Sequence, residues 1–122
     1  MKEVKQKQNL ETNKQPSNIE AEQALIGSIL VNNDILDEVS IIVGSTMFYD
    51  PAHIKIYEVI ENLNNKGMIA NPITLKNYFE KDNMLQDVGG TEYLVKLTRF
   101  SSSTKQAVDY AKIIHEMYLR RE

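Results

Sequence analysis

Cysteine is absent from this 122-residue sequence, and its absence excludes several kinds of site. Without thiols there is no disulfide framework, no thiolate zinc site and no cysteine nucleophile. Long hydrophobic runs are missing too: no stretch approaches the roughly 18 apolar residues of a membrane span. The charged start of the chain also lacks the apolar centre of a signal peptide. We therefore expect a cytoplasmic protein with no membrane contact.

Motifs for nucleotide binding and catalysis are also lacking. Gly89-Gly90 is followed by Thr-Glu-Tyr, not by Gly-Lys-Ser/Thr, so it predicts a tight turn rather than a phosphate-binding loop. His53 and His115 lie far apart, and neither has a ligand partner one helical turn later. We expect His53 to cap or pack a helix and His115 to lie on a solvated helix surface. The sequence predicts no catalytic residue, no cofactor, no metal and no enzymatic activity for this chain.

Positive charge is scarce where nucleic-acid binding would need it. Residues 1–16 hold four lysines and two glutamates, and the chain from Ser17 onward carries ten basic and fifteen acidic residues. Binding to a phosphate backbone relies on clustered Lys and Arg. A small helical DNA-binding regulator is the alternative interpretation, but the last helix alternates its basic residues with Asp109, Glu116 and Glu122. A helical enzyme using His53 or a carboxylate is a third, weaker hypothesis.

What remains is the composition of one ordinary globular domain, with 42% hydrophobic and 25% charged residues. Residues 1–16 hold only Val4 and Leu10 as sizeable apolar groups, so we expect a disordered tail there. Residues 17–100 are expected to form a helical globular head. Residues 101–122 are expected to add a last, separate helix.

Helical periodicity accounts for the apolar residues from Ser17 onward. Ser17 and Glu20 have the spacing of a capping box, and the following helix should bury a stripe with a 3.6-residue repeat. Gly27 lies inside that helix, where glycine commonly allows another helix to approach closely. A second helix over residues 34–43 is expected to end at Gly44 in a left-handed cap.

Two cap-then-proline pairs predict the next helix starts. Asp50-Pro51 begins a helix that runs to about residue 66, where Gly67 closes it, and Asn71-Pro72 begins one that runs to about residue 81. Gly89-Gly90 precedes a fifth helix, and the serines at 101–103 precede a sixth. No segment alternates apolar and polar residues as a strand does. We therefore predict an all-α, compact bundle of about six helices.

The aromatic residues divide into two groups. Tyr57, Tyr78 and Phe79 lie at core positions of their predicted helices, whereas three other tyrosines lie near the end of the chain. Exposed aromatic residues are favoured anchors of protein interfaces, so we expect partner contacts at Tyr93, Tyr110 and Tyr118. The last helix has no stop signal, and its apolar stripe (Ala107, Tyr110, Ala111, Ile114 and Tyr118) is expected to lack a partner within the chain.

An ordered set of motifs resembles the N-terminal domain of the DnaB family of bacterial replicative DNA helicases. The resemblance covers residues 16–122 and is specific because the motifs occur in the family's order and spacing. They are SNIEAEQALIG at 17–27, Phe48-Tyr49 with His53, Ile56 and Lys66-Gly67, Ile73-Thr74-Leu75, VGGTEYL at 88–94, YAKII at 110–114 and Leu119-Arg120-Arg121. Asn71 departs from the family's usual aspartate, and Ser102 stands at a position that is often proline.

The resemblance implies an interaction domain of a hexameric helicase. In this family a small helical globule precedes a two-helix hairpin, hairpins of neighbouring subunits pair, and the C-terminal domain of primase docks on the resulting collar. Glu20 and Tyr93 match positions associated with primase docking, and Tyr110, Ile114 and Tyr118 would line the pairing face between copies of the chain. The last helix would be the first arm of an incomplete hairpin. ATP and Mg²⁺ belong to a separate motor domain that unwinds DNA, and this sequence lacks it.

Overall fold

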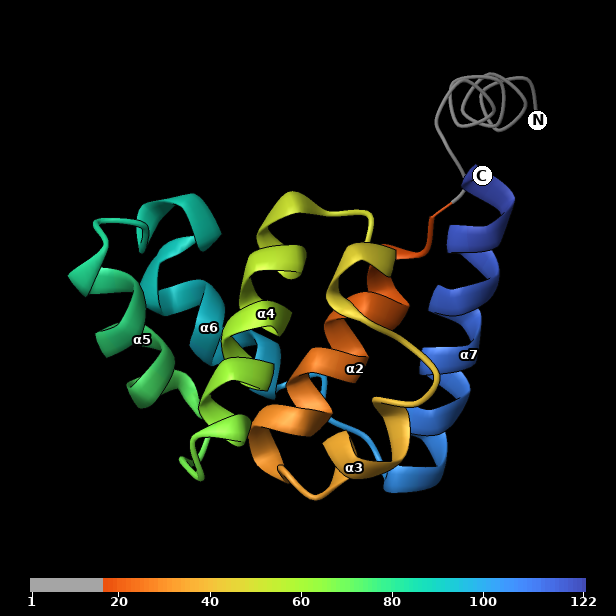
Figure 1. Ribbon diagram of the computed structural model, residues 1–122, viewed down its shortest axis with the longest axis horizontal. Helices are drawn as coiled ribbons and strands as arrows, with labels where there is room; N and C mark the ends of the chain where they lie inside the picture. Colours follow the sequence, from red (N-terminus) through yellow and green to blue (C-terminus); the bar gives the residue numbers. More distant parts are fainter. Residues whose placement is uncertain (1–16) are drawn as a thin grey trace.

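Helices account for all the regular structure of the part of the chain that the computed structural model describes, residues 17–122 (Figure 1). The predicted tail of residues 1–16 lies outside this range. No strand occurs within residues 17–122, so the all-α prediction is confirmed there. None of the helices in this range is long and apolar enough to cross a membrane. The elements are α2 (Ile19–Val31), α3 (Ile35–Val39), η1 (Ser45–Met47), α4 (Pro51–Asn65), α5 (Pro72–Lys81), η2 (Gln86–Val88), α6 (Gly90–Thr98) and α7 (Thr104–Arg121).

The two cap-then-proline pairs begin helices as predicted. The Asp50 side chain accepts a hydrogen bond from the backbone N–H of Ala52 at 2.8 Å, at the start of α4. The Asn71 side chain accepts from the two backbone N–H groups of Ile73 and Thr74 at the start of α5. In both cases proline follows at a position where a missing N–H leaves no helical bond unmade.

Three details at other helix ends differ from the predictions. Asn18, not Ser17, caps α2, because its side chain accepts from the backbone N–H of Ala21 at 2.9 Å. The second helix is shorter than predicted: α3 ends at Val39 and residues 40–42 form a turn. Gly44 is extended, with φ −120°, so the left-handed cap predicted for it is wrong, whereas Gly67 has φ +74° after α4.

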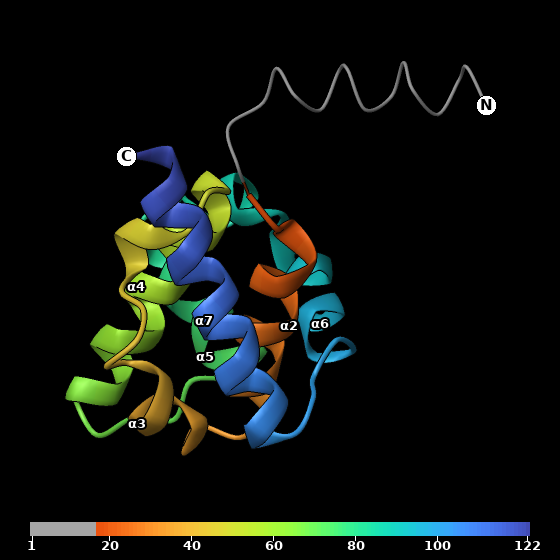
Figure 2. The same cartoon turned by 90° about the vertical axis from the view of Figure 1, so that its right-hand side faces the viewer.

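Helix α2 is the centre of the bundle. It packs against α6 on one side and α7 on another, with α4 also in contact, as the two views in Figures 1 and 2 show. Gly27 makes the α6 contact possible. A Cβ atom at this position would lie 1.9 Å from the carbonyl oxygen of Leu97, so any side chain would collide with the backbone. The predicted role of Gly27, close approach of another helix, is confirmed.

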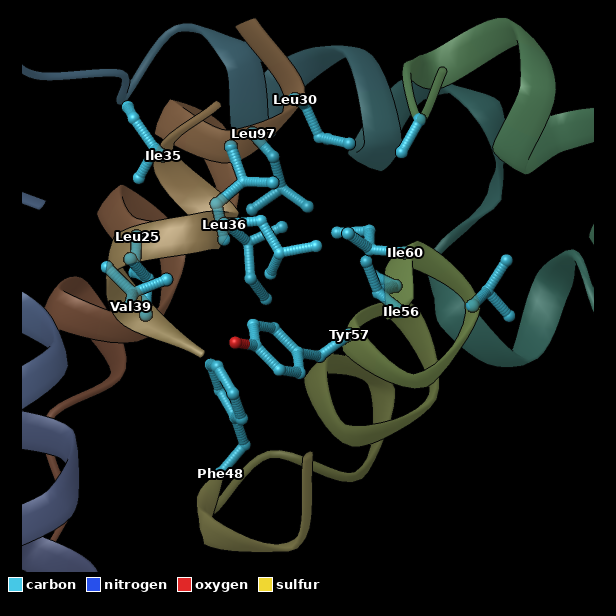
Figure 3. Close-up of a cluster of buried hydrophobic side chains, with 14 of the residues drawn as sticks. Leu25, Leu30, Ile35, Leu36, Val39, Phe48, Ile56, Tyr57, Ile60 and Leu97 are labelled. Carbon is cyan, nitrogen blue, oxygen red and sulfur yellow. The ribbon is translucent and has the colours of Figure 1, made fainter. Parts of the chain in front are cut away.

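The hydrophobic core runs through all the helices and also includes the segment before α4. Phe48 inserts beside Tyr57 with 4.8 Å between the ring centroids, and the two rings lie close together in Figure 3. Burial raises the pKa of the Tyr57 hydroxyl above its ordinary value, and this hydroxyl donates to the carbonyl oxygen of Val43. Tyr57 and Phe79 are buried as predicted, and Tyr78 is half-buried.

The apolar stripe of the last helix is largely covered within the domain. Ala107, Ala111 and Ile114 are all buried, with Ile114 only 1% exposed, because α7 packs against α2 and α3. The expectation that the whole stripe lacks a partner is therefore wrong for these three residues. Tyr110 and Tyr118 on the same helix keep part of their surface exposed. Figure 2 shows α7 along the outside of the bundle.

Candidate functional site

A chain of buried polar groups joins α2, α4 and α6. The Nδ1 atom of His53 lies 2.7 Å from Oε1 of Glu22, and its Nε2 atom lies 2.6 Å from the hydroxyl oxygen of Tyr93. The side-chain amide of Gln23 donates to the same Tyr93 oxygen at 3.2 Å. His53 is fully buried and Glu22 is 1% exposed. Three helices that are distant in sequence thus meet at one line of hydrogen bonds.

The Glu22 carboxylate is held by the backbone as well as by His53. The N–H of Tyr49 donates to its Oε2 atom at 2.7 Å, and the N–H of Asp50 donates to its Oε1 atom at 3.3 Å. These donors belong to the segment that enters α4. A buried carboxylate is costly unless its oxygens accept hydrogen bonds, and here both oxygens do. Glu22 therefore fixes the entry to α4 relative to α2.

Tyr93 lies at the surface end of this chain of groups. Its side chain is half-buried, and its ring is nearly parallel to the His53 ring, with 8° between the planes and 5.9 Å between the centroids. Burial is the main cause of the raised pKa of the Tyr93 hydroxyl, the Gln23 hydrogen bond lowers that pKa, and the charges of Asp50 and Glu22 raise it further. A Cβ atom on Gly89 would lie 2.7 Å from the Cβ of Tyr93, so Gly89 supplies room for this side chain.

Gln23 links Tyr93 to the helical turn that carries Glu20, and these are the two residues that the sequence predicted to dock a partner. Glu20 is exposed in the first turn of α2. Gln23 lies three residues further along, hence on the same helix face, and it contacts Tyr93 directly. The sequence predicted Glu20 and Tyr93 from separate motifs, and in the fold the helical turn after Glu20 contacts Tyr93 through Gln23.

The end of α7 is tied to the same segment that holds Glu22. The Arg121 guanidinium donates to the carbonyl oxygen of Met47 at 2.7 Å and lies 5.4 Å from the centre of the Tyr49 ring. His115 is half-buried with Nδ1 3.0 Å from the carbonyl oxygen of Ile42. The prediction that His115 lies on a solvated surface is therefore wrong, because α7 packs against the turn after α3.

The arrangement suits positioning better than acid–base catalysis. Both oxygens of Glu22 and both ring nitrogens of His53 already have partners within the domain. Among residues 17–122 no group of three or more acidic or histidine side chains is placed to hold a metal ion. Sequence reasoning assigned His53 to capping or packing and gave Glu22 no role. The only sequence signal for Glu22 was its position, as an acidic residue, next to the predicted buried stripe of α2.

Comparison with known proteins points to one family. The family model described as the DnaB-like helicase N-terminal domain matches residues 14–116. The replicative DNA helicase DnaB of Rickettsia felis is 45% identical over 106 residues, which is 87% of this chain and 22% of that protein. The corresponding helicase of Pasteurella multocida is 33% identical, over 88% of this chain and 23% of its own length. This chain therefore spans less than a quarter of the length of these two relatives.

A solved structure has the same fold. The crystal structure of the N-terminal domain of DnaB helicase from Mycobacterium tuberculosis superposes with a TM-score of 0.84 and 30% sequence identity. The match covers 88% of this chain and 78% of that one. The predicted all-α architecture is confirmed by this likeness as well as by the helices themselves.

Proposed function

This chain belongs to the family of DnaB-like helicase N-terminal domains, and we propose that it is the interaction domain of a replicative DNA helicase. In this proposal it docks the C-terminal domain of primase and helps subunits associate in a hexameric ring. Unwinding of duplex DNA with ATP and Mg²⁺ would belong to a motor domain outside this sequence. The protein would act in the cytoplasm, where the chromosome is replicated.

The contact of Tyr93 with Gln23, three residues after the exposed Glu20 on α2, is the observation that carries the docking proposal. The exposed carboxylate of Glu20 and the half-buried ring of Tyr93 would offer a partner a charge and a large, rigid aromatic group. Tyrosine is enriched among the residues that dominate binding energy in protein interfaces, because it buries much area with few rotatable bonds.

Subunit association is proposed for the outer side of α7. Tyr110 and Tyr118 are partly exposed, and Leu119, next to Tyr118 in sequence, is 56% exposed. Ile114 is buried inside the domain and has no side-chain surface to offer to a second copy. The pairing role therefore rests on Tyr110 and Tyr118, with Leu119 added from the structure.

Calorimetry with the C-terminal domain of a cognate primase tests the docking surface. We expect binding by the unaltered chain and at least about a tenfold weaker Kd for Tyr93→Ala, the loss typical of a dominant interface residue. Ile41→Ala is the matched control, because Ile41 is 87% exposed and lies after α3. Absence of binding by the unaltered chain would contradict primase docking. Salt-sensitive binding to random duplex DNA would instead support a DNA-binding regulator.

Sedimentation equilibrium tests the pairing surface. We expect self-association at high protein concentration that is weakened by the double substitution of Tyr110 and Tyr118 with serine. Ile41→Ser is the control, since it also exchanges an exposed apolar residue for serine. Equal self-association of the control and the double variant would show that α7 is not the pairing surface.

A further inference from the structure

The structure assigns to Glu22 and His53 the role of positioning residues that hold the Tyr93 ring in a fixed orientation at the proposed docking surface. This inference rests on the proposed function for its binding readout. Neither residue offers its own side chain to a partner, because both are buried. They act through the hydrogen bonds that end at the Tyr93 hydroxyl.

The direction of these hydrogen bonds follows from the groups at the two ends. Both Glu22 oxygens accept from backbone N–H groups, so the carboxylate acts as an acceptor toward His53 as well. The proton of the imidazole then lies on Nδ1, and Nε2 accepts the hydroxyl proton of Tyr93. The hydroxyl oxygen is left to accept from Gln23. This arrangement gives a partner to every group in the series from Glu22 to Gln23.

Tyr93 is constrained at both ends of its side chain. Near the backbone, Gly89 packs against its Cβ and ring, and a side chain at position 89 would collide there. At the far end, the hydroxyl is held by His53 and Gln23. Its ring lies nearly parallel to a fully buried imidazole, which it meets through the hydroxyl. A partner therefore meets an aromatic surface whose rotation is already restricted, which removes an entropy cost from binding.

The first test is spectroscopic and uses the unaltered chain without a partner. Nitrogen-15 NMR of the imidazole of His53 should show the Nδ1-protonated form with an unprotonated Nε2. A proton on Nε2, whether or not Nδ1 also carries one, would overturn the inference, because Tyr93 could then not donate to Nε2. This result does not depend on whether primase binds.

The second test is a double-mutant cycle on binding of the primase C-terminal domain. His53→Gln and Tyr93→Phe should each weaken binding about 3- to 10-fold, the range expected for immobilising one side chain on association. The double variant should be no weaker than Tyr93→Phe, because His53 acts only through the hydroxyl. If the losses of affinity caused by the two single substitutions multiply in the double variant, the two residues act independently and the inference is overturned.

A control separates positioning from general loss of stability. Asn33→Ala removes partly buried hydrogen bonds to Ile29 and Ala70 at the other end of α2, and it should leave primase binding unchanged. If His53→Gln fails to fold, Tyr93→Phe decides alone: unchanged affinity would overturn the inference. If the unaltered chain binds no primase, the proposed function fails, while the imidazole spectrum still decides the hydrogen-bond arrangement.

Discussion

Helices α6 and α7 both pack against α2, and they are held there in different ways. Against α6, the backbone of α2 comes so close at Gly27 that no side chain fits between them. Against α7, the contact is spread over small and medium apolar side chains on successive turns, Ala107, Ala111 and Ile114. The contact with α6 depends on one residue, Gly27, because no larger residue fits at that position. The contact with α7 should weaken gradually, one methyl group at a time.

Replacing Gly27 with alanine is expected to give the largest effect. The added Cβ would lie 1.9 Å from the Leu97 carbonyl oxygen, a backbone atom that cannot rotate away. Overpacking of cores costs about 1–3 kcal/mol and sometimes more. We expect a loss of at least about 3 kcal/mol in the free energy of unfolding, measured by urea denaturation.

Gly44→Ala is the matched control for this substitution. No atom lies within 4 Å of the Cβ that it would add, and the φ of −120° at Gly44 suits any residue. Its effect should stay within about 0.5 kcal/mol. Similar losses for the two variants would show that the contact between α2 and α6 tolerates a side chain, and the contrast with α7 would disappear.

The sequence predicted the Gly27 contact because a glycine inside a helix is a local signal with few explanations. The helix starts at Asp50-Pro51 and Asn71-Pro72 were also predictable, because a capping side chain binds backbone groups only two or three residues away. The left-handed cap predicted at Gly44 is wrong because a glycine after an apolar run is compatible with an extended link as well as with such a cap. The length of α3 depends on packing against α7, which is distant in sequence.

Ser28 joins α2 to the residues that precede α7, and its loss should have an intermediate effect. Its buried hydroxyl donates to the carbonyl oxygen of Ala24 at 2.7 Å and accepts from the backbone N–H of Ser102 at 2.8 Å. Ser28→Ala would leave that N–H without its acceptor, which costs about 1–3 kcal/mol. We expect about 1.5 kcal/mol by urea denaturation.

Ser101→Ala provides the comparison for Ser28, because Ser101 is exposed and lies next to Ser102. The control should change the free energy of unfolding by less than about 0.5 kcal/mol. If both variants behave alike, a water molecule serves the Ser102 N–H as well as Ser28 does. The start of α7 would then depend on its apolar contacts alone.

The candidate site was predictable only at its surface. Motifs in the sequence indicated Glu20 and Tyr93. The contact of Gln23 with Tyr93, which connects them, could be seen only in the fold. The role of Glu22 was not predictable, because its partners, His53 and the Tyr49 N–H, lie 31 and 27 residues away. The apolar stripe of α7 was visible in the sequence, but periodicity cannot say whether the partner of a stripe lies in the same chain or in another.

Ile114→Val tests the spread-out contact of α7 and should give the smallest effect. Ile114 is 1% exposed, so removing one methyl group leaves a small gap in the core. Such substitutions cost about 0.5–1.5 kcal/mol, and we expect about 1 kcal/mol. Ile41→Val is the same substitution at a position that is 87% exposed, and it should change stability by only a few tenths of a kcal/mol.

A loss at Ile114 as large as that of Gly27→Ala would mean that α7, too, depends on a single residue. Equal, negligible losses at positions 114 and 41 would mean that α7 is loosely attached, which would free Ile114 for the pairing role that the sequence suggested.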